Sequence, residues 1–120
     1  MRTAQEMIAE AKAKACCISA DQAKSQIAGQ PEVLLLDVRE PSEVDQLRVA
    51  GFVNVPRGVL EMKIEQLCPD HNKPIYIHCA TGGRAALSAV QLEKMGYTNV
   101  SVIDCNCDTL VEAFIEPRVE

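Results

Sequence analysis

Aromatic residues are scarce in this chain of 120 residues, which contains no tryptophan, two tyrosines and two phenylalanines. Proteins that bind single-stranded nucleic acids stack the bases on aromatic side chains, so this scarcity argues against such a surface. Positive charge is also short, because 17 acidic residues outnumber 12 basic ones and give a net charge of -5 at pH 7. That balance provides no attraction to phosphate backbones or anionic membranes. We therefore expect no nucleic-acid and no membrane partner.

Long apolar runs are missing as well. No run in the sequence reaches the length that crosses a bilayer, and Arg2 and Glu6 lie where a signal peptide would need its apolar segment. These features predict a cytoplasmic protein. Its six cysteines are then expected to be reduced thiols rather than the disulfide framework that a secreted chain of this size would suggest.

The remaining composition is that of one ordinary domain. A hydrophobic content of 48% and a charged content of 24% suit a single core. Apolar residues at helical spacing predict an amphipathic helix over residues 3–15, which would cover one edge of the core or, alternatively, form a dimer contact. We expect this N-terminal helix (residues 1–15) to precede a domain at residues 16–120, with the protein a monomer or a homodimer.

Strands and helices are predicted to alternate along that domain. Apolar and β-favouring runs predict strands at residues 16–18, 33–38, 74–78 and 98–103, and helical spacing predicts helices at 19–27, 42–47, 59–67 and 85–95. Ser19 is a suitable N-cap for the first of these helices. The alternation favours an α/β fold, a parallel sheet of about five strands with helices on both faces.

One strand-to-helix junction carries the candidate chemistry. A strand ending at His78 leads into a loop that begins with Cys79 and ends with Arg84. The intervening loop residues are Ala80, Thr81, Gly82 and Gly83. Small residues let backbone N–H groups converge on the cysteine sulfur, and the helix N-terminus and the guanidinium add positive charge. The pattern predicts a reactive thiolate at Cys79, with a buried structural cysteine as the alternative.

The pattern C-x-x-G-x-R at such a junction resembles the active-site loop of the rhodanese family of sulfurtransferases. The resemblance extends over roughly residues 15–115 and implies a single-domain rhodanese without cofactor or metal. It implies that Cys79 takes a sulfane sulfur from a donor such as thiosulfate as a persulfide and passes it to a thiol, cyanide or a protein. Arg84 would recognise the anionic donor. Thr81 would donate a hydrogen bond to the sulfur or stiffen the loop.

Two other functions use the same loop. One is a persulfide carrier or docking module without efficient turnover. The other is a phosphatase or arsenate reductase, which is disfavoured because phosphatase cradles have five residues between the cysteine and the arginine. Cys79 and Arg84 are separated by four.

A second segment resembling rhodaneses is Asp37-Val38-Arg39, at the end of an apolar strand. In the family this segment lies beside the active-site loop, which implies that Asp37 and Arg39 are ion-paired supports of the site. A plain solvated turn is the alternative.

The sequence departs from its relatives after the last predicted strand, where Cys105 and Cys107 replace a pair of glycines. Ligands collect at the carboxyl ends of parallel strands, so either thiol is predicted to reach the sulfur on Cys79 and resolve or accept it. Packed or solvent-facing thiols are the alternative.

The two histidines have simpler interpretations. His78 precedes Cys79 on a strand, so its side chain should point to the opposite face as a buried residue rather than a catalytic base. Cys68 and His71 have a spacing that zinc sites use, but a site needs four ligands and the remaining candidates, Cys105 and Cys107, are distant in the chain. We therefore expect no metal.

Overall fold

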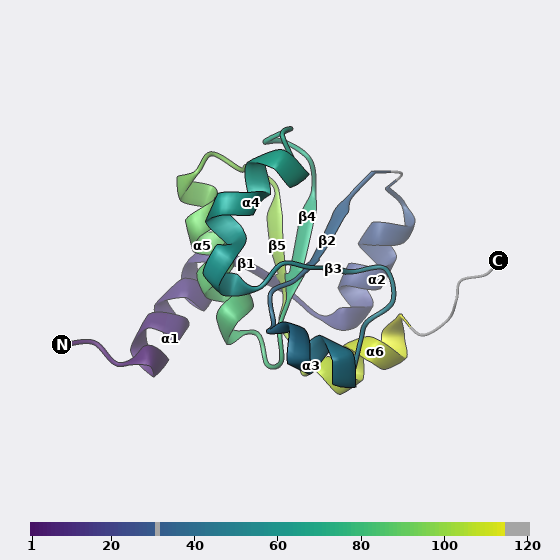
Figure 1. Cartoon of the computed structure of the whole chain (residues 1–120), viewed down its shortest axis with the longest axis horizontal. Helices are drawn as coiled ribbons and strands as arrows, with labels where there is room; N and C mark the ends of the chain where they lie inside the picture. Colours follow the sequence, from purple (N-terminus) through teal and green to yellow (C-terminus); the bar gives the residue numbers. More distant parts are fainter. Residues whose placement is uncertain (31, 115–120) are drawn as a thin grey trace.

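Five short parallel strands form one sheet with the order β1-β5-β4-β2-β3 (Figure 1). A computed structural model describes residues 1–30 and 32–114 of the chain. The strands are β1 (Cys16–Ile18), β2 (Leu34–Asp37), β3 (Val53–Asn54), β4 (Ile75–His78) and β5 (Val100–Ile103). The predicted parallel sheet is thus confirmed. The predicted domain also includes residues 31 and 115–120, and the resemblance includes residues 31 and 115; these positions lie outside the described residues.

Six α-helices connect and flank these strands within the described residues. They are α1 (Ala4–Lys14), α2 (Ala20–Ala28), α3 (Pro41–Gln46), α4 (Leu60–Leu67), α5 (Gly83–Lys94) and α6 (Cys107–Ala113). A short 3-10 turn, Arg57–Val59, precedes α4. Ser19 caps α2 as predicted, and its hydroxyl accepts a hydrogen bond from the Gln22 backbone. No helix in the described part of the chain is both long and apolar enough to span a membrane.

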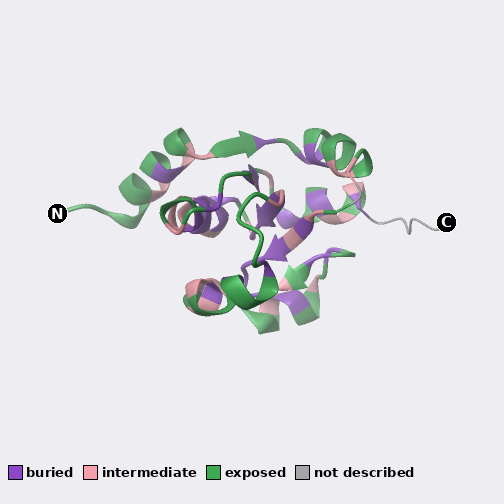
Figure 2. Cartoon of the chain, turned by 90° about the horizontal axis from the view of Figure 1, so that it is seen from above, coloured by how far each residue is buried: buried purple, intermediate pink, exposed green. Residues whose placement is uncertain are grey.

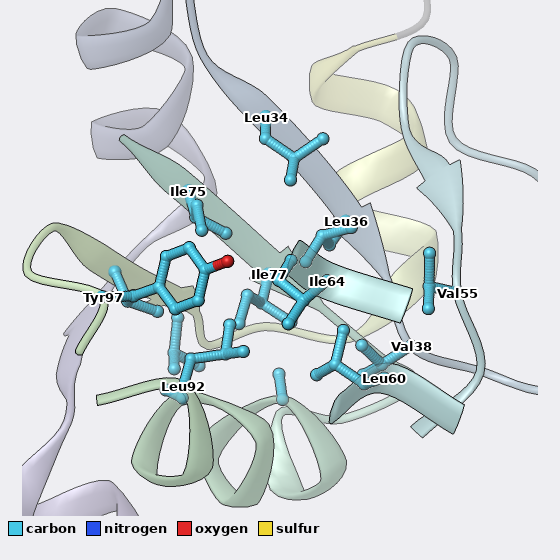
Figure 3. Close-up of a cluster of buried hydrophobic side chains, with 14 of the residues drawn as sticks. Leu34, Leu36, Val38, Val55, Leu60, Ile64, Ile75, Ile77, Leu92 and Tyr97 are labelled. Carbon is cyan, nitrogen blue, oxygen red and sulfur yellow. The ribbon is translucent and has the colours of Figure 1, made fainter. Parts of the chain in front are cut away.

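The sheet is covered on both faces, and the alternation of side chains along β4 shows this directly. Ile75 and Ile77 pack into a core shared with α4 and α5, whereas Tyr76 belongs to a second core shared with α2 and α6. Figure 3 shows the first core, in which the Tyr97 ring lies beside Ile75; the Tyr97 hydroxyl donates to the Cys68 carbonyl at 2.7 Å. All four residues of β4 are buried (Figure 2), so the strand that leads to Cys79 is fixed from both sides.

The helix α1 packs along α5 (Figure 1). Much of α1 is exposed, and Ala11 is its buried residue (Figure 2). The contact is tight near the start of α5, where a Cβ atom on Gly83 would lie 3.0 Å from Cδ1 of Ile8. The N-terminal helix therefore lies next to the loop that carries Cys79.

The boundary of α5 differs from the prediction. This helix begins at Gly83 instead of Ala85, so Gly83 and Arg84 belong to its first turn. Helical periodicity did not reveal this start because glycine has a weak helix propensity. The consequence is that the loop after Cys79 is shorter than predicted, and the helix N-terminus comes closer to the cysteine.

Candidate functional site

The sulfur of Cys79 lies at the carboxyl end of β4, directly in front of the first turn of α5. Its Sγ atom accepts hydrogen bonds from the backbone N–H groups of Gly82 at 3.1 Å and Ala85 at 3.3 Å. The N–H groups of a first helical turn have no partner within the helix. The Cys79 sulfur therefore occupies the position of an N-cap acceptor, where two amide donors and the helix dipole favour negative charge.

The prediction placed the sulfur-binding amides at residues 80–84. The hydrogen bonds found come from Gly82, which is in that set, and from Ala85, which is not. Ala85 was missed because the helix was expected to start there. Thr81 is exposed, and its role as a donor to the sulfur stays a prediction.

Arg84 is already paired with a carboxylate. Its Nη1 and Nη2 atoms donate to the two carboxylate oxygens of Glu43, at 2.7 and 2.9 Å. These bonds are the main cause that lowers the pKa of Glu43 to about 2. The pKa of Arg84 is raised, chiefly by Glu43 and to a smaller degree by the charge of a Cys79 thiolate. Arg84 thus joins the first turn of α5 to α3 and lies near the sulfur.

Asp37 and Arg39 form a buried ion pair beside the site, with Arg39 Nη2 at 2.8 Å from Asp37 Oδ2. The pair is not the solvated turn that the sequence left open. Burial opposes ionisation of Asp37, but its contacts with the His78 ring and the Arg39 guanidinium outweigh it and lower its pKa. Arg39 also donates to the carbonyls of Glu43 and Leu47. The end of β2 is therefore tied to α3, the helix that holds Arg84.

His78 is fully buried on the side of the sheet away from the Cys79 core, as the strand alternation predicts. Its ring packs edge-on against Phe52, with ring centroids 4.8 Å apart. Nε2 lies 3.3 Å from Asp37 Oδ2, and Nδ1 lies 3.2 Å from the Cys79 carbonyl oxygen. The ring is thus a packing and hydrogen-bonding neighbour of the Cys79 backbone.

The two thiols after β5 differ in their surroundings. Cys107 is buried at the start of α6, and its backbone N–H donates to the Ala80 carbonyl at 3.0 Å. Burial raises the pKa of the Cys107 thiol. The charge of Arg39 lowers this pKa, and the charge of a Cys79 thiolate raises it. Cys105 is half-buried against the second core, and burial raises its pKa as well. The backbone of Cys107 therefore lies beside the Cys79 loop, and its side chain is buried in the second core.

A pair of charged residues lies on the loop, and no sequence pattern indicated it. Lys12 on α1 and Asp104 after β5 form an ion pair, Nζ to Oδ1 at 3.2 Å. A Cβ atom on Gly82 would lie 2.6 Å from Asp104 Oδ1 and 3.4 Å from Lys12 Nζ. Cys79 is only 1% exposed. The contact joins residues 92 positions apart, so no local pattern could have indicated it.

The other candidate ligand residues lie elsewhere. Cys68 is buried, and its Sγ lies 3.4 Å from the Asp70 carbonyl oxygen, while the His71 ring packs against Tyr97. Among the residues the structure describes, no group of three or more His, Cys, Asp or Glu side chains is placed to hold a metal ion.

Comparisons with known proteins agree with this architecture. The chain is 32% identical over 65 residues to the Escherichia coli thiosulfate sulfurtransferase PspE, covering 54% of this chain and 62% of PspE. The polysulfide-sulfur transferase homodimer of Wolinella succinogenes superposes with a TM-score of 0.75 and 28% identity, covering 88% of this chain and 80% of that one. A Rhodopseudomonas palustris protein of unknown function has a TM-score of 0.83 at 24% identity, covering 94% and 92% of the two chains, and shows the shared fold.

The matched region covers most of this chain but less of its relatives. The chain spans between 44% and 62% of the length of the first three curated relatives it matches. A family model described as Rhodanese-like domain matches residues 19–108, which include Asp37, Cys79, Arg84 and Cys107 and leave α1 outside. The chain belongs to the rhodanese-like domain family.

Proposed function

We propose that this chain is a sulfurtransferase that carries a sulfane sulfur on Cys79 as a persulfide. The observation that carries the proposal is the acceptance of two backbone hydrogen bonds by the Cys79 sulfur at the N-terminus of α5. Such donors stabilise a thiolate before the reaction and a terminal sulfur anion after it. The sulfurtransferases among the relatives support the same reaction class.

In the first half-reaction the Cys79 thiolate attacks the outer sulfur of thiosulfate. A new S–S bond forms to Cys79, the sulfur–sulfur bond of the donor breaks, and its electron pair leaves with sulfite. The product is a Cys79 persulfide anion. The N–H groups of Gly82 and Ala85 lie where they can stabilise sulfur charge without reorganising, because the helix already fixes them.

In the second half-reaction an acceptor thiolate attacks the outer sulfur of the protonated persulfide. The bond between that sulfur and Cys79 breaks, so the acceptor leaves as a persulfide and Cys79 returns to a thiolate. Cyanide attacking the same sulfur would leave as thiocyanate. All six cysteines are free in the structure, which suits a reducing compartment such as the cytoplasm, where thiol acceptors are available.

The supporting residues act through position. Arg84 is occupied by Glu43 and holds α3 against the first turn of α5, so we assign it first to shaping the loop and second to neutralising the sulfur anion. Asp37 and Arg39 fix the other end of α3. Donor recognition by Arg84, as the resemblance implied, would require it to share its guanidinium with Glu43.

The alternatives differ in rate or in chemistry. A persulfide carrier would acquire sulfur on Cys79 and release it slowly, and the 1% exposure of Cys79 favours this reading over that of an open active site. A phosphatase or arsenate reductase would need a wider cradle than the one here, in which Gly82 and Ala85 already contact the sulfur.

Mass spectrometry of the intact protein tests the proposal. We expect thiosulfate to add the mass of one sulfur atom, a thiol to remove it, and Cys79→Ser to abolish both changes. Cys68→Ser is the matched control because its thiol is also buried but lies at the opposite end of β4. The proposal fails if wild-type protein gains no sulfur, or if Cys79→Ser gains it equally. Release that is slow compared with loading would identify a carrier.

The same spectra address the second thiol. We propose that Cys107, rather than Cys105, attacks the loaded Cys79, since the Cys107 backbone is bonded to Ala80. Attack by the Cys107 thiolate on Sγ of the Cys79 persulfide would form the disulfide and release hydrosulfide, and an external thiol would then reduce that disulfide. A Cys79–Cys105 disulfide after loading, or unchanged behaviour of Cys107→Ser, would refute this assignment.

A further inference from the structure

The feature that remains unexplained is the Lys12–Asp104 ion pair lying on the Cys79 loop. The helix α1 that supplies Lys12 lies outside the matched family region, residues 19–108. Lys12 therefore lies outside the segment that the family model describes. In Figure 1 this helix runs beside α5, and its Ile8 side chain lies at Gly83, the first residue of α5, where the Cys79 loop ends.

The distances place the ammonium group next to the sulfur-binding amide. Gly82 donates its N–H to the Cys79 sulfur at 3.1 Å. A Cβ atom on the same residue would lie 3.4 Å from Lys12 Nζ. Both side chains of the pair are about one third exposed, at 34% for Lys12 and 36% for Asp104. Solvent thus reaches the pair, which lies against the residue whose N–H is bonded to the Cys79 sulfur.

The three cations around the loop are held with different strength. Arg39 is 3% exposed and bonded to Asp37 by several hydrogen bonds. Arg84 makes two hydrogen bonds to Glu43. Lys12 makes one contact of 3.2 Å to Asp104 at a partly exposed site, and such single exposed pairs contribute little to stability. Of the three, Lys12 is therefore the cation most easily transferred to an incoming anion.

We propose that Lys12 is a donor-specificity residue that binds the anionic head of the sulfur donor at the entrance to Cys79, with Asp104 holding it in place until the donor arrives. The inference rests on the proposed sulfur transfer to Cys79. A sulfonate-type donor such as thiosulfate is a dianion, and the exchange of Asp104 for the donor moves the Lys12 side chain off the loop. The same movement uncovers Gly82, whose N–H is bonded to the Cys79 sulfur.

Asp104 has the opposite effect on the donor. Its backbone N–H is bonded to the Ile18 carbonyl at 2.8 Å, which fixes its position at the end of β5. Its carboxylate repels a dianion and competes for the Lys12 ammonium. Removing the positive charge of Lys12 should therefore weaken the binding of the donor. Removing the negative charge of Asp104 should strengthen that binding, although either change breaks the ion pair.

The test measures the rate of sulfur loading on Cys79 as a function of thiosulfate concentration, followed by the rate of discharge to a thiol. For Lys12→Gln we expect a half-saturating thiosulfate concentration roughly tenfold higher than in the wild type, as for the loss of one charged contact. The rate at saturation and the discharge rate should stay unchanged. Lys12→Arg should restore most of the affinity, and Asp104→Asn should lower the half-saturating concentration severalfold.

Lys14→Gln is the matched control, because Lys14 is on the same helix but lines a groove with Val90 and Lys94, further along α5. It should leave loading unchanged. If Lys12→Gln and Asp104→Asn shift the half-saturating concentration in the same direction, or if Lys12→Gln behaves like Lys14→Gln, the inference is wrong. Failure of the proposed function looks different, because wild-type Cys79 would then take no sulfur at any thiosulfate concentration.

Discussion

Gly82 combines two structural requirements in one residue. Its φ of +99° is in the left-handed region, which L side chains rarely adopt, and this conformation turns its N–H toward the Cys79 sulfur. Its Cα also faces the Lys12–Asp104 pair so closely that a Cβ would meet Asp104 Oδ1 at 2.6 Å. A side chain at this position would therefore both strain the backbone and displace the Lys12–Asp104 pair.

Gly82→Ala should lower the free energy of unfolding by about 2 kcal/mol, the cost of a strained φ together with a close contact. It should also slow sulfur loading of Cys79, since the amide would turn away from the sulfur. Urea unfolding and mass spectrometry after thiosulfate measure the two effects.

Gly96→Ala separates the two causes. Gly96 has a φ of +101°, and nothing lies within 4 Å of its Cβ position. This control should therefore show the strain alone, with normal loading. Equal losses of stability and equal loading in both variants would mean that the contact with Asp104 has no importance.

At the scale of elements, α3 and α5 meet through Glu43 and Arg84, which are 41 residues apart in the sequence. The apolar runs predicted the strands and most helices because burial and periodicity are local properties. They also located Cys79 at the end of β4. The partner of Arg84 could not be predicted, since the pairing depends on how α3 lies beside the loop. The resemblance therefore suggested a donor-binding guanidinium where the structure shows a paired one.

The sequence left open whether Cys79 is buried, and the structure shows that it is. Small residues after a cysteine predict amides that can reach it, and Gly82 fulfils this expectation. The contacts of α1 with Gly82 and Gly83 were not predicted, because the weak pattern of alanines in α1 gave no register on α5. Contacts of this kind follow from tertiary packing and not from spacing along one helix.

Glu43→Gln should reveal the linkage between α3 and α5 through its pH dependence. The pKa of Glu43 is lowered from 4.5 to about 2 by Arg84. A carboxyl group with a lowered pKa stabilises the folded state above its unfolded pKa and loses that contribution as the pH falls through the folded value. The free energy of unfolding of the wild type should therefore exceed that of the variant at pH 7. The difference should be no more than about 1 kcal/mol, because solvent screens this partly exposed pair.

Urea unfolding at several pH values measures this difference. It should stay constant from pH 7 down to about pH 5 and disappear by about pH 2. Asp45→Asn, which neutralises the other carboxylate of α3, should show no comparable dependence. A difference that grows toward low pH would have the wrong sign for this ion pair.

At the scale of the whole molecule, the buried Asp37–Arg39 pair connects several elements at the carboxyl edge of the sheet. Arg39 reaches the carbonyls of Glu43 and Leu47, while the Asn54 side chain donates to the Asp37 and Arg39 carbonyls. His78 at the end of β4 lies against the same carboxylate. The strands β2, β3 and β4 and the helix α3 therefore share one polar centre beneath the Cys79 loop.

Asp37→Asn should destabilise the entire fold by about 3 kcal/mol, because it leaves the buried Arg39 charge without a counter-charge. Cooperative urea unfolding measures this loss, and Asp70→Asn, at an exposed loop carboxylate, should change stability by no more than about 0.5 kcal/mol. Arg39→Met should cost less in the Asp37→Asn background than in the wild type, since the unpaired charge is then removed. Additive losses in the double variant would show that the two charges do not stabilise each other, and the polar centre would then act through its hydrogen bonds alone.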